Sequence, residues 1–211
     1  MRDIPLFTLE SGIASLFLRN IPYTKKAYVK ILNSDDLTRF LDECISFCRS
    51  AGAESVYATG YSGLSAYPVA TKILKMECCN PLPETDAILI TANESNMEQW
   101  RNIYNDKMRE VPNASQIGFA EAKKYLDSQT CYFVQKGKFL LGIGVASNDR
   151  IDAIASLQPG AGMDVVCALS KAISSSRIQL QVADSNCKAI SLYRGLGFVV
   201  TEETEIWYKI F

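Results

Sequence analysis

The sequence contains no histidine, and this absence narrows the chemistry open to any active site. It excludes a Ser-His-Asp or Cys-His mechanism and removes the commonest protein metal ligand. Proton transfer near neutral pH must then use a carboxylate, tyrosine, lysine, cysteine or water. The sequence also has no CxxC pair, so we expect no metal site.

The chain also lacks an excess of charge of one sign and any long apolar run. Its 22 basic and 23 acidic side chains leave a net charge of −1, so no overall field draws it to nucleic acid or to an anionic membrane. No run approaches the roughly 20 apolar residues that span a bilayer, and the N-terminus lacks the apolar core of a secretion signal. We therefore expect a cytoplasmic protein without a nucleic-acid or membrane partner; a homodimer is compatible with this composition.

The seven cysteines are an odd number, and we expect all of them to be reduced. Cys44 and Cys48 are one helical turn apart in an amphipathic pattern, where buried thiols behave as small hydrophobes. Cys78 and Cys79 are adjacent and would point to opposite faces of a strand. Cys187 has no histidine to activate it, so an inert side chain is favoured over a nucleophile.

From about residue 84 onward, the hydrophobic periodicity predicts alternating strands and helices. The expected order is one strand, two helices, three strands, a helix, a strand, a helix and two strands. The segments are 86–91, 93–111, 118–126, a hairpin turning at 136–138, 150–157, 162–173, 177–183, a helix beginning at Asn186, and two strands within 198–210.

The first 80 residues predict a strand, a helix, a strand, a short helix and a strand. Ser34 can cap the first helix, whose apolar stripe includes Phe40 and Cys44, and Gly52 ends it. The apolar run ILKMEC resembles IQLQVA in the C-terminal half, which indicates a degenerate half-copy; chance similarity explains it equally well. We predict an N-terminal extension, 1–82, that buttresses a domain at 83–211, extends its sheet or shapes its acceptor pocket.

The segment Val182–Phe198, VADSNCKAISLYRGLGF, joins a short apolar strand to a helix and a Gly-Phe turn. It resembles the last motif of the GCN5-related N-acetyltransferases (GNAT family), most strongly when the whole of 150–211 is considered. The resemblance implies an α/β fold with a mixed α+β sheet, preceded here by an α/β extension. It also implies direct transfer from acetyl-CoA, without metal. The matching positions are Asn186, Ala189, Leu192, Tyr193, Gly197 and Phe198.

The turn LQPGAGMDVV is the candidate cradle for the CoA pyrophosphate, since glycines admit a phosphate and a helix start offers free N–H donors. A Pro-Gly turn is also ordinary punctuation before a helix. The turn is shorter than the family's and lacks its arginine, and Asp164 would repel a pyrophosphate if it faced one. The predicted cofactor-binding residues are Leu157, Gly160, Ala161, Gly162, Met163 and Asn186.

Tyr193 is the candidate general acid, because a phenol with a pKa of about 10 stays protonated at neutral pH and can donate to a leaving thiolate. Its alternative role is core packing. Asn186 could bind the pantetheine arm or cap the following helix, with Ser185 as a competing cap. Ser156 could orient a water, and Asp152 is either a general base or a solvent-facing acid. The resemblance implies that backbone N–H groups near Ser156 and Leu157 polarise the thioester carbonyl.

The sequence therefore predicts an acetyl-CoA-dependent N-acetyltransferase acting on a small-molecule or peptide primary amine. The alternative is a catalytically weak or inactive CoA-binding or interaction module that keeps the fold. Glu98, Glu110 and Asp127 could attract a cationic acceptor, but they are equally ordinary acids of a helix surface.

Overall fold

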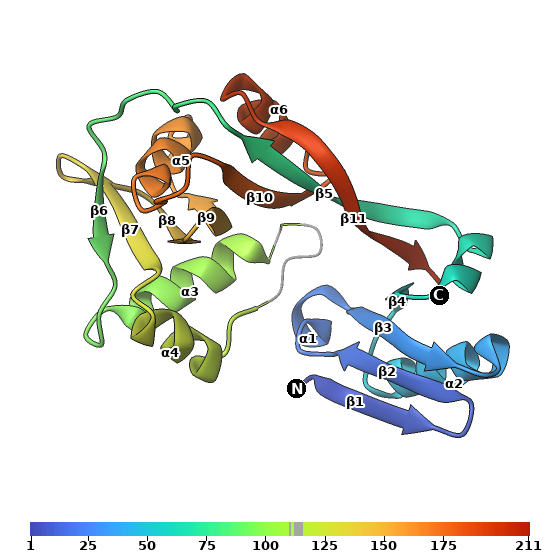
Figure 1. Ribbon diagram of the computed structural model, residues 1–211. Helices are drawn as coiled ribbons and strands as arrows, with labels where there is room; N and C mark the ends of the chain where they lie inside the picture. The colour runs from blue at the N-terminus through green and yellow to red at the C-terminus, as the bar shows by residue number, and fades with distance from the viewer. Residues whose placement is uncertain (110, 112–115) are drawn as a thin grey trace. The chain divides into compact units, whose positions relative to one another are not determined.

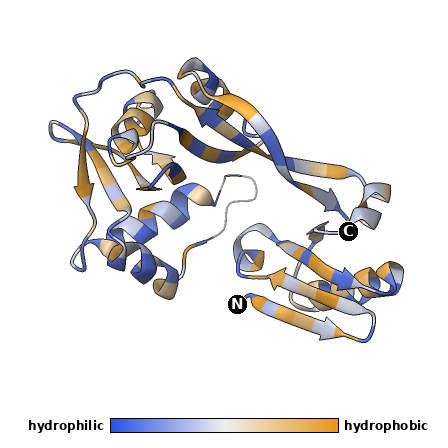
Figure 2. Ribbon diagram, in the orientation of Figure 1, coloured by the Kyte–Doolittle hydropathy of each residue, from blue (hydrophilic) through white to orange (hydrophobic). Residues whose placement is uncertain are grey.

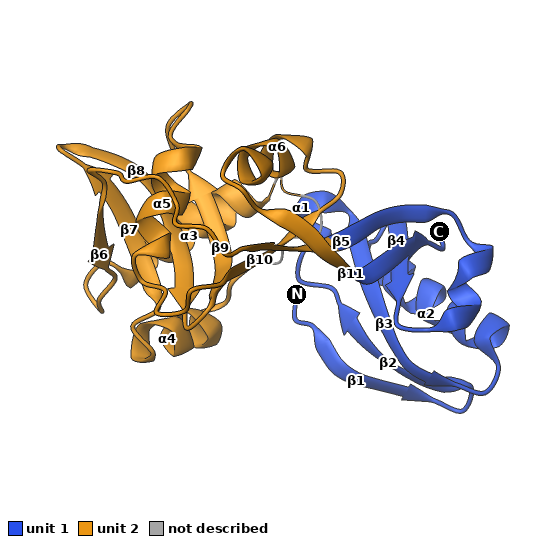
Figure 3. Cartoon of the chain, turned by 45° about the horizontal axis from the view of Figure 1, so that its top comes forward, with its two compact units in different colours: residues 1–73, 203–211 blue, residues 74–202 orange. Residues whose placement is uncertain are grey.

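A computed structural model of the protein describes residues 1–109, 111 and 116–211. The chain forms two compact units, residues 1–73 with 203–211 (unit 1) and residues 74–202 (unit 2) (Figure 3). It passes from unit 1 to unit 2 within strand β5 (Val69–Cys78) and returns within β11 (Val199–Lys209). The sequence predicted one boundary, between residues 82 and 83. In the structure, unit 1 ends at residue 73 and also includes the last nine residues of the chain, 203–211.

Unit 1 is a sheet with strand order β1-β2-β3-β4-β11-β5, and one long helix packs on it (Figure 1). Three strands precede that helix instead of the single predicted strand, because only two residues separate the end of β1 from Gly12, which starts a second strand. The remaining elements are β1 (Ile4–Leu9), β2 (Gly12–Phe17), α1 (Ile21–Thr24), β3 (Lys26–Ser34), α2 (Leu37–Ser50), β4 (Ser55–Thr59) and the 3-10 helix η1 (Ser62–Ala66).

Helix α2 buries the predicted stripe, and Figure 2 shows hydrophobic and hydrophilic residues alternating along it. Burial raises the pKa of Cys44 to about 12 and that of Cys48 to about 11, so both are protonated thiols. The helix cap differs from the prediction: Asp36 accepts a hydrogen bond from the Arg39 amide (3.1 Å), whereas the Ser34 hydroxyl donates to the Ser11 carbonyl (3.0 Å). All seven cysteines are free.

Unit 2 has strand order β6-β7-β8-β9-β10-β5-β11, with helices on both faces. Helices α5 and α6 pack on one face and helices α3 and α4 on the other (Figure 1). Its predicted helices and strands are present in the predicted order. They are β6 (Ile88–Thr91), α3 (Met97–Met108), α4 (Phe119–Asp127), β7 (Cys131–Lys136), β8 (Phe139–Ser147), β9 (Arg150–Ser156), α5 (Gly162–Ser170), β10 (Ile178–Ala183) and α6 (Cys187–Gly195).

The C-terminal segment is one continuous strand, β11, so the prediction of two strands was wrong. Its polar middle, TEETE, contains no glycine or proline to turn the chain. Ion pairs tie it to other strands of the sheet: Glu203 to Lys72 on the adjacent β5 (2.9 Å), and Glu205 to Lys30 on β3, one strand beyond β4 (2.8 Å). Among the described residues, no helix has both the length and the hydropathy needed to cross a membrane.

Candidate functional site

Strands β9 and β10 are parallel neighbours that pair only at their beginnings. The paired residues are Arg150 with Gln179 and Ile151 with Leu180. Beyond this point β9 runs to Ser156 and β10 to Ala183 without further pairing, so the ladder opens toward the carboxyl ends of both strands. Openings at the carboxyl ends of strands are where α/β sheets bind their ligands.

A β-bulge in β9 coincides with the point where this opening begins. On the β8 side, Val145 pairs with Ala153 and Ala146 pairs with Ile151, so Asp152 is an extra residue in β9. A bulge bends its strand and increases the local twist. We attribute the separation of β9 from β10 to this bend, which the sequence alone did not indicate.

The last residue of β9, Ser156, directs its backbone amide toward the opening. The Leu157 amide donates to the Leu141 carbonyl (2.8 Å) on the β8 side and is therefore occupied. Successive residues of a strand direct their amides to opposite sides, so the Ser156 amide faces the β10 side, where pairing has ended. The Ser156 hydroxyl donates to the Gln158 carbonyl (2.9 Å) and is tied to the following turn.

The turn after β9 leads into helix α5, whose first amides receive no side-chain cap. Gly160 has a φ of +80°, which favours glycine, and an added Cβ there would meet nothing within 4 Å. Gly162 contacts α6, since an added Cβ would lie 2.9 Å from Leu192 Cδ2. Ala161 is the buried N-cap residue and Met163 is exposed. The helix start therefore offers unused N–H donors beside open space, which suits a phosphate.

Asp164, in the first turn of α5, is neutralised by two other segments. Its carboxylate accepts a hydrogen bond from the Thr85 hydroxyl (2.5 Å) and forms an ion pair with Lys136 (3.5 Å). Lys171 at the end of α5 also donates to the Thr85 and Ala87 carbonyls (2.7 and 3.0 Å). The acid therefore fastens α5 to the chain before β6, and its charge is compensated.

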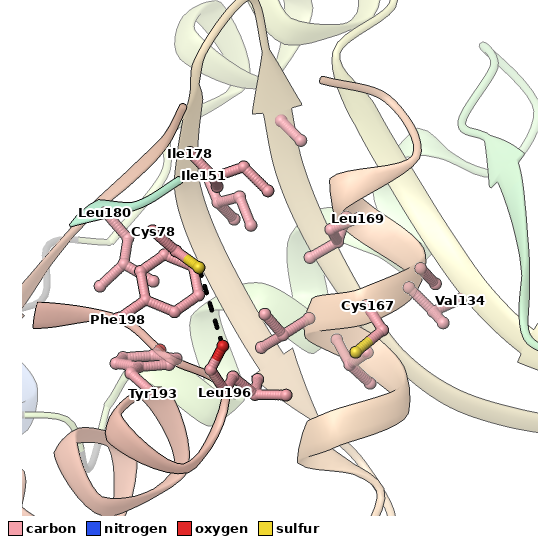
Figure 4. Packing of buried hydrophobic residues seen from close by; sticks show 14 of the residues in the cluster. Cys78, Val134, Ile151, Cys167, Leu169, Ile178, Leu180, Tyr193, Leu196 and Phe198 are labelled. Atoms are coloured by element: carbon pink, nitrogen blue, oxygen red, sulfur yellow. Dashed lines mark hydrogen bonds between the residues drawn. The ribbon is translucent and has the colours of Figure 1, made fainter. Parts of the chain in front are cut away.

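Tyr193 lies in the core between α6 and the sheet, 7% exposed (Figure 4). Its ring centroid is 5.9 Å from that of Phe198, and beside them the Cys78 thiol lies 3.7 Å from the Leu196 carbonyl. Burial raises the pKa of Tyr193 to about 12, so the phenol is protonated at neutral pH. Among the described residues, no hydrogen bond holds its hydroxyl, which leaves the proton available.

Asn186 begins α6 and caps it, because its side-chain oxygen accepts from the Ala189 amide (3.2 Å). The competing cap, Ser185, is exposed and precedes the cap position. Asn186 also comes three residues after the end of β10, so it lies at the carboxyl end where the ladder is open. The cap uses one acceptor of the amide, and its NH₂ group can still donate to a ligand.

Asp152 does not lie with the other predicted site residues. It is exposed and accepts a hydrogen bond from Arg150 Nε (3.0 Å) at the paired end of β9. Ser156 is four positions further along the strand, about 13 Å at the rise of a strand. The structure thus brings Ser156, Leu157 and the turn up to Met163 together at one end of β9, and α6 packs on that turn through Leu192. Asp152 lies toward the other end of β9.

Two features of the site were missed by sequence reasoning. The bulge depends on the register between β8 and β9, and the partners of Asp164 are far from it in the chain. Glu110, one of the predicted acceptor-side acids, lies outside the described residues. Within the described part of the chain, no cluster of cysteine and acidic residues could hold a metal ion.

No family model and no curated protein sequence matches the chain. Solved structures do match it, and GNAT-family acetyltransferases are among them. A provisionally assigned acetyltransferase from Pyrococcus horikoshii superposes with a TM-score of 0.59 at 9% identity, over 97% of this chain and 72% of that one. A GCN5-related N-acetyltransferase from Kribbella flavida gives 0.54 at 8%, over 94% of this chain and 56% of that one.

A functionally unknown conserved protein from Staphylococcus epidermidis also matches, with a TM-score of 0.54 at 11% identity, over 99% of this chain and 94% of that one. At such identities the likeness concerns the fold alone. The chain has a mixed, curled α+β sheet of the GNAT fold.

Proposed function

We propose that the protein is an N-acetyltransferase that moves an acetyl group directly from acetyl-CoA to a primary amine. The observation that carries this proposal is the opening between β9 and β10 next to the uncapped start of α5. The residues there fit acetyl-CoA: Gly160 leaves space, the first amides of α5 are donors, and Asp164 is compensated. The backbone from Leu157 to Met163 would hold the pyrophosphate, and Asn186 would donate to the pantetheine arm.

Ser156 and Tyr193 supply the two polar groups that this transfer needs. The Ser156 amide would donate to the thioester carbonyl oxygen, where negative charge grows as the amine nitrogen attacks. A C–N bond forms and the C–S bond breaks, and Tyr193 gives its proton to the departing thiolate. The attacking nitrogen loses its proton to water at the opening. Asp152 takes no part in this scheme, since it is paired with Arg150 at the far end of β9.

Unit 1 is, in our proposal, a degenerate half-copy of the same fold. Its β2, β3, α2 and β4 repeat the order of β8, β9, α5 and β10: an antiparallel pair, a helix and a parallel strand. The copies differ at the opening, because β3 and β4 pair continuously over five residues, from Lys26–Ser55 to Lys30–Thr59. The Asp36 side chain also occupies the start of α2. Unit 1 therefore has no place for acetyl-CoA, and one molecule binds per chain.

The first test is thiol release from acetyl-CoA across a panel of small-molecule and peptide amines. We expect release above the hydrolysis rate with at least one amine. Saturable acetyl-CoA binding without release for any amine would favour the alternative, a module that keeps the fold and has lost transfer. Absence of binding would contradict both.

A further inference from the structure

A cavity of about 390 Å³ lies between α3 and α4. This volume lies within the range of small-molecule sites. None of its lining residues comes from β9, β10, α5 or α6, so it is separate from the opening described above. The lining residues are Glu94, Met97, Glu98, Arg101, Phe119, Ala122, Lys123 and Leu126.

The inner part of the cavity is apolar and its rim carries an exposed aromatic ring. Met97 and Ala122 are buried, and Leu126 is half-buried. Phe119 is 70% exposed, an unusual position for a phenyl ring, and the Arg101 guanidinium carbon lies 3.9 Å from the ring centroid. The stacking fixes the guanidinium at the edge of an apolar surface. A ligand with an apolar part could cover both.

The charged groups around the cavity are not paired with one another, and Glu94, Glu98 and Lys123 are exposed. Among the described residues, none of Glu94, Glu98, Arg101 and Lys123 takes part in an ion pair. Arg101 Nε is buried without a hydrogen-bond partner, while the Nη2 group of the same side chain donates to Asn102 Oδ1 (3.2 Å). Nε is closed to solvent, so a ligand would bind the guanidinium through its Nη groups. A carboxylate is the group that a guanidinium binds best.

We propose that this cavity binds an apolar α-amino acid. The carboxylate would bind Arg101 and Lys123, the ammonium group would bind Glu94 and Glu98, and the apolar side chain would lie against Met97, Phe119 and Leu126. Two cations and two anions match a zwitterion. A simple acid or a simple amine would leave one charged pair without a partner. This binding does not depend on acetyl transfer.

The test is calorimetric titration of the full chain with L-tryptophan, indole-3-propionate and tryptamine; the second lacks only the ammonium group of L-tryptophan and the third lacks only its carboxylate. We expect saturable binding of L-tryptophan that is at least about tenfold tighter than that of either analogue, because each analogue loses one charge-assisted contact. Absence of saturable heat with L-tryptophan overturns the proposal. Tryptamine binding as tightly as L-tryptophan also overturns it, since the carboxylate would then have no role.

Variants locate the binding. Arg101→Met and Lys123→Glu should each raise the Kd for L-tryptophan at least about tenfold. Lys124→Glu, at an exposed neighbouring position, should leave this Kd unchanged. Lys123 is exposed, so its variant keeps the proposal testable even if Arg101→Met does not fold. Equal affinities for Lys123→Glu and Lys124→Glu contradict the site. Acetyl-CoA binding, measured on the same variants, should not change.

Discussion

Tyr193 combines a buried ring with a hydroxyl that is free among the described residues. Tyr193→Phe keeps the ring against Phe198 and removes only the proton donor. We expect kcat for thiol release to fall by about 100-fold, with little change in the KM for acetyl-CoA. Tyr104→Phe, at a similarly buried tyrosine on the opposite face of the sheet, is the control and should keep the rate. A rate unchanged in Tyr193→Phe removes the general-acid role.

The raised pKa of Tyr193 also has a consequence for stability. In the folded chain its pKa is about 12, against an ordinary value of 10.0, so the folded state holds the proton more tightly. The resulting stabilisation is complete below pH 10 and is lost as the pH rises through 12. Between pH 9 and pH 11, halfway through this window, the free energy of unfolding of Tyr193→Phe should fall by about 1 kcal/mol less than that of the wild type. Urea unfolding of both proteins at both pH values measures this. An equal fall in the free energy of unfolding for Tyr193→Phe and the wild type would contradict it.

The Ser156 amide can be tested separately from the Ser156 hydroxyl. Ser156→Pro removes the N–H at a position whose amide faces the unpaired side of β9, where proline leaves the ladder intact. We expect kcat to fall by about 100- to 1,000-fold, as for loss of one oxyanion donor. Ser156→Ala, which keeps the amide, should stay within about threefold of the wild type. Circular dichroism checks that both variants are folded. If kcat then falls equally in both, the amide has no part in the mechanism.

At the scale of elements, α5 is held in place by Asp164. The sequence raised the concern that this carboxylate repels a pyrophosphate, but the Thr85 hydroxyl and the Lys136 ammonium group bind it. Asp164→Asn should therefore destabilise the fold by about 1 kcal/mol and leave the Kd for acetyl-CoA within about threefold. Urea unfolding and calorimetry measure the two effects. Tenfold tighter binding in the variant would show that the carboxylate does repel the ligand.

The same elements show what could be predicted from the sequence. Local periodicity predicted the helices and strands of unit 2, because Met97, Trp100 and Tyr104 recur at helical spacing and all three are buried. The bulge at Asp152 could not be predicted, since it exists only in the register between β9 and β8. The motif that contains Asn186 indicated the fold. The sequence left open whether Asn186 or Ser185 caps α6, and the hydrogen bond from the Ala189 amide shows that Asn186 does.

At the scale of the whole molecule, β5 joins the two units covalently and completes the core of unit 2. Met76 and Cys78 are 0% and 1% exposed and pack with Tyr193, Leu196 and Phe198. The sequence predicted a strand here, but its place between β10 and β11 is a long-range pairing that no local pattern encodes.

A fragment beginning at Pro83 therefore lacks a central strand, and we expect it to have no cooperative thermal transition. In the full chain, Met76→Ala should cost about 2–5 kcal/mol, as for other buried truncations. Val69→Ala on the same strand, at a side chain that is 53% exposed, is the control and should cost well under 1 kcal/mol. A fragment that folds and releases thiol from acetyl-CoA would show that residues 1–82 are dispensable.

Calorimetric titration of the full chain with acetyl-CoA tests the central claim most directly, since the opening between β9 and β10 and the uncapped start of α5 are proposed to bind it. The account predicts saturable binding with one molecule per chain, because β3 and β4 pair continuously in the unit that we propose to be a half-copy. Absence of binding would contradict the proposed site, and two molecules per chain would contradict the closed half-copy.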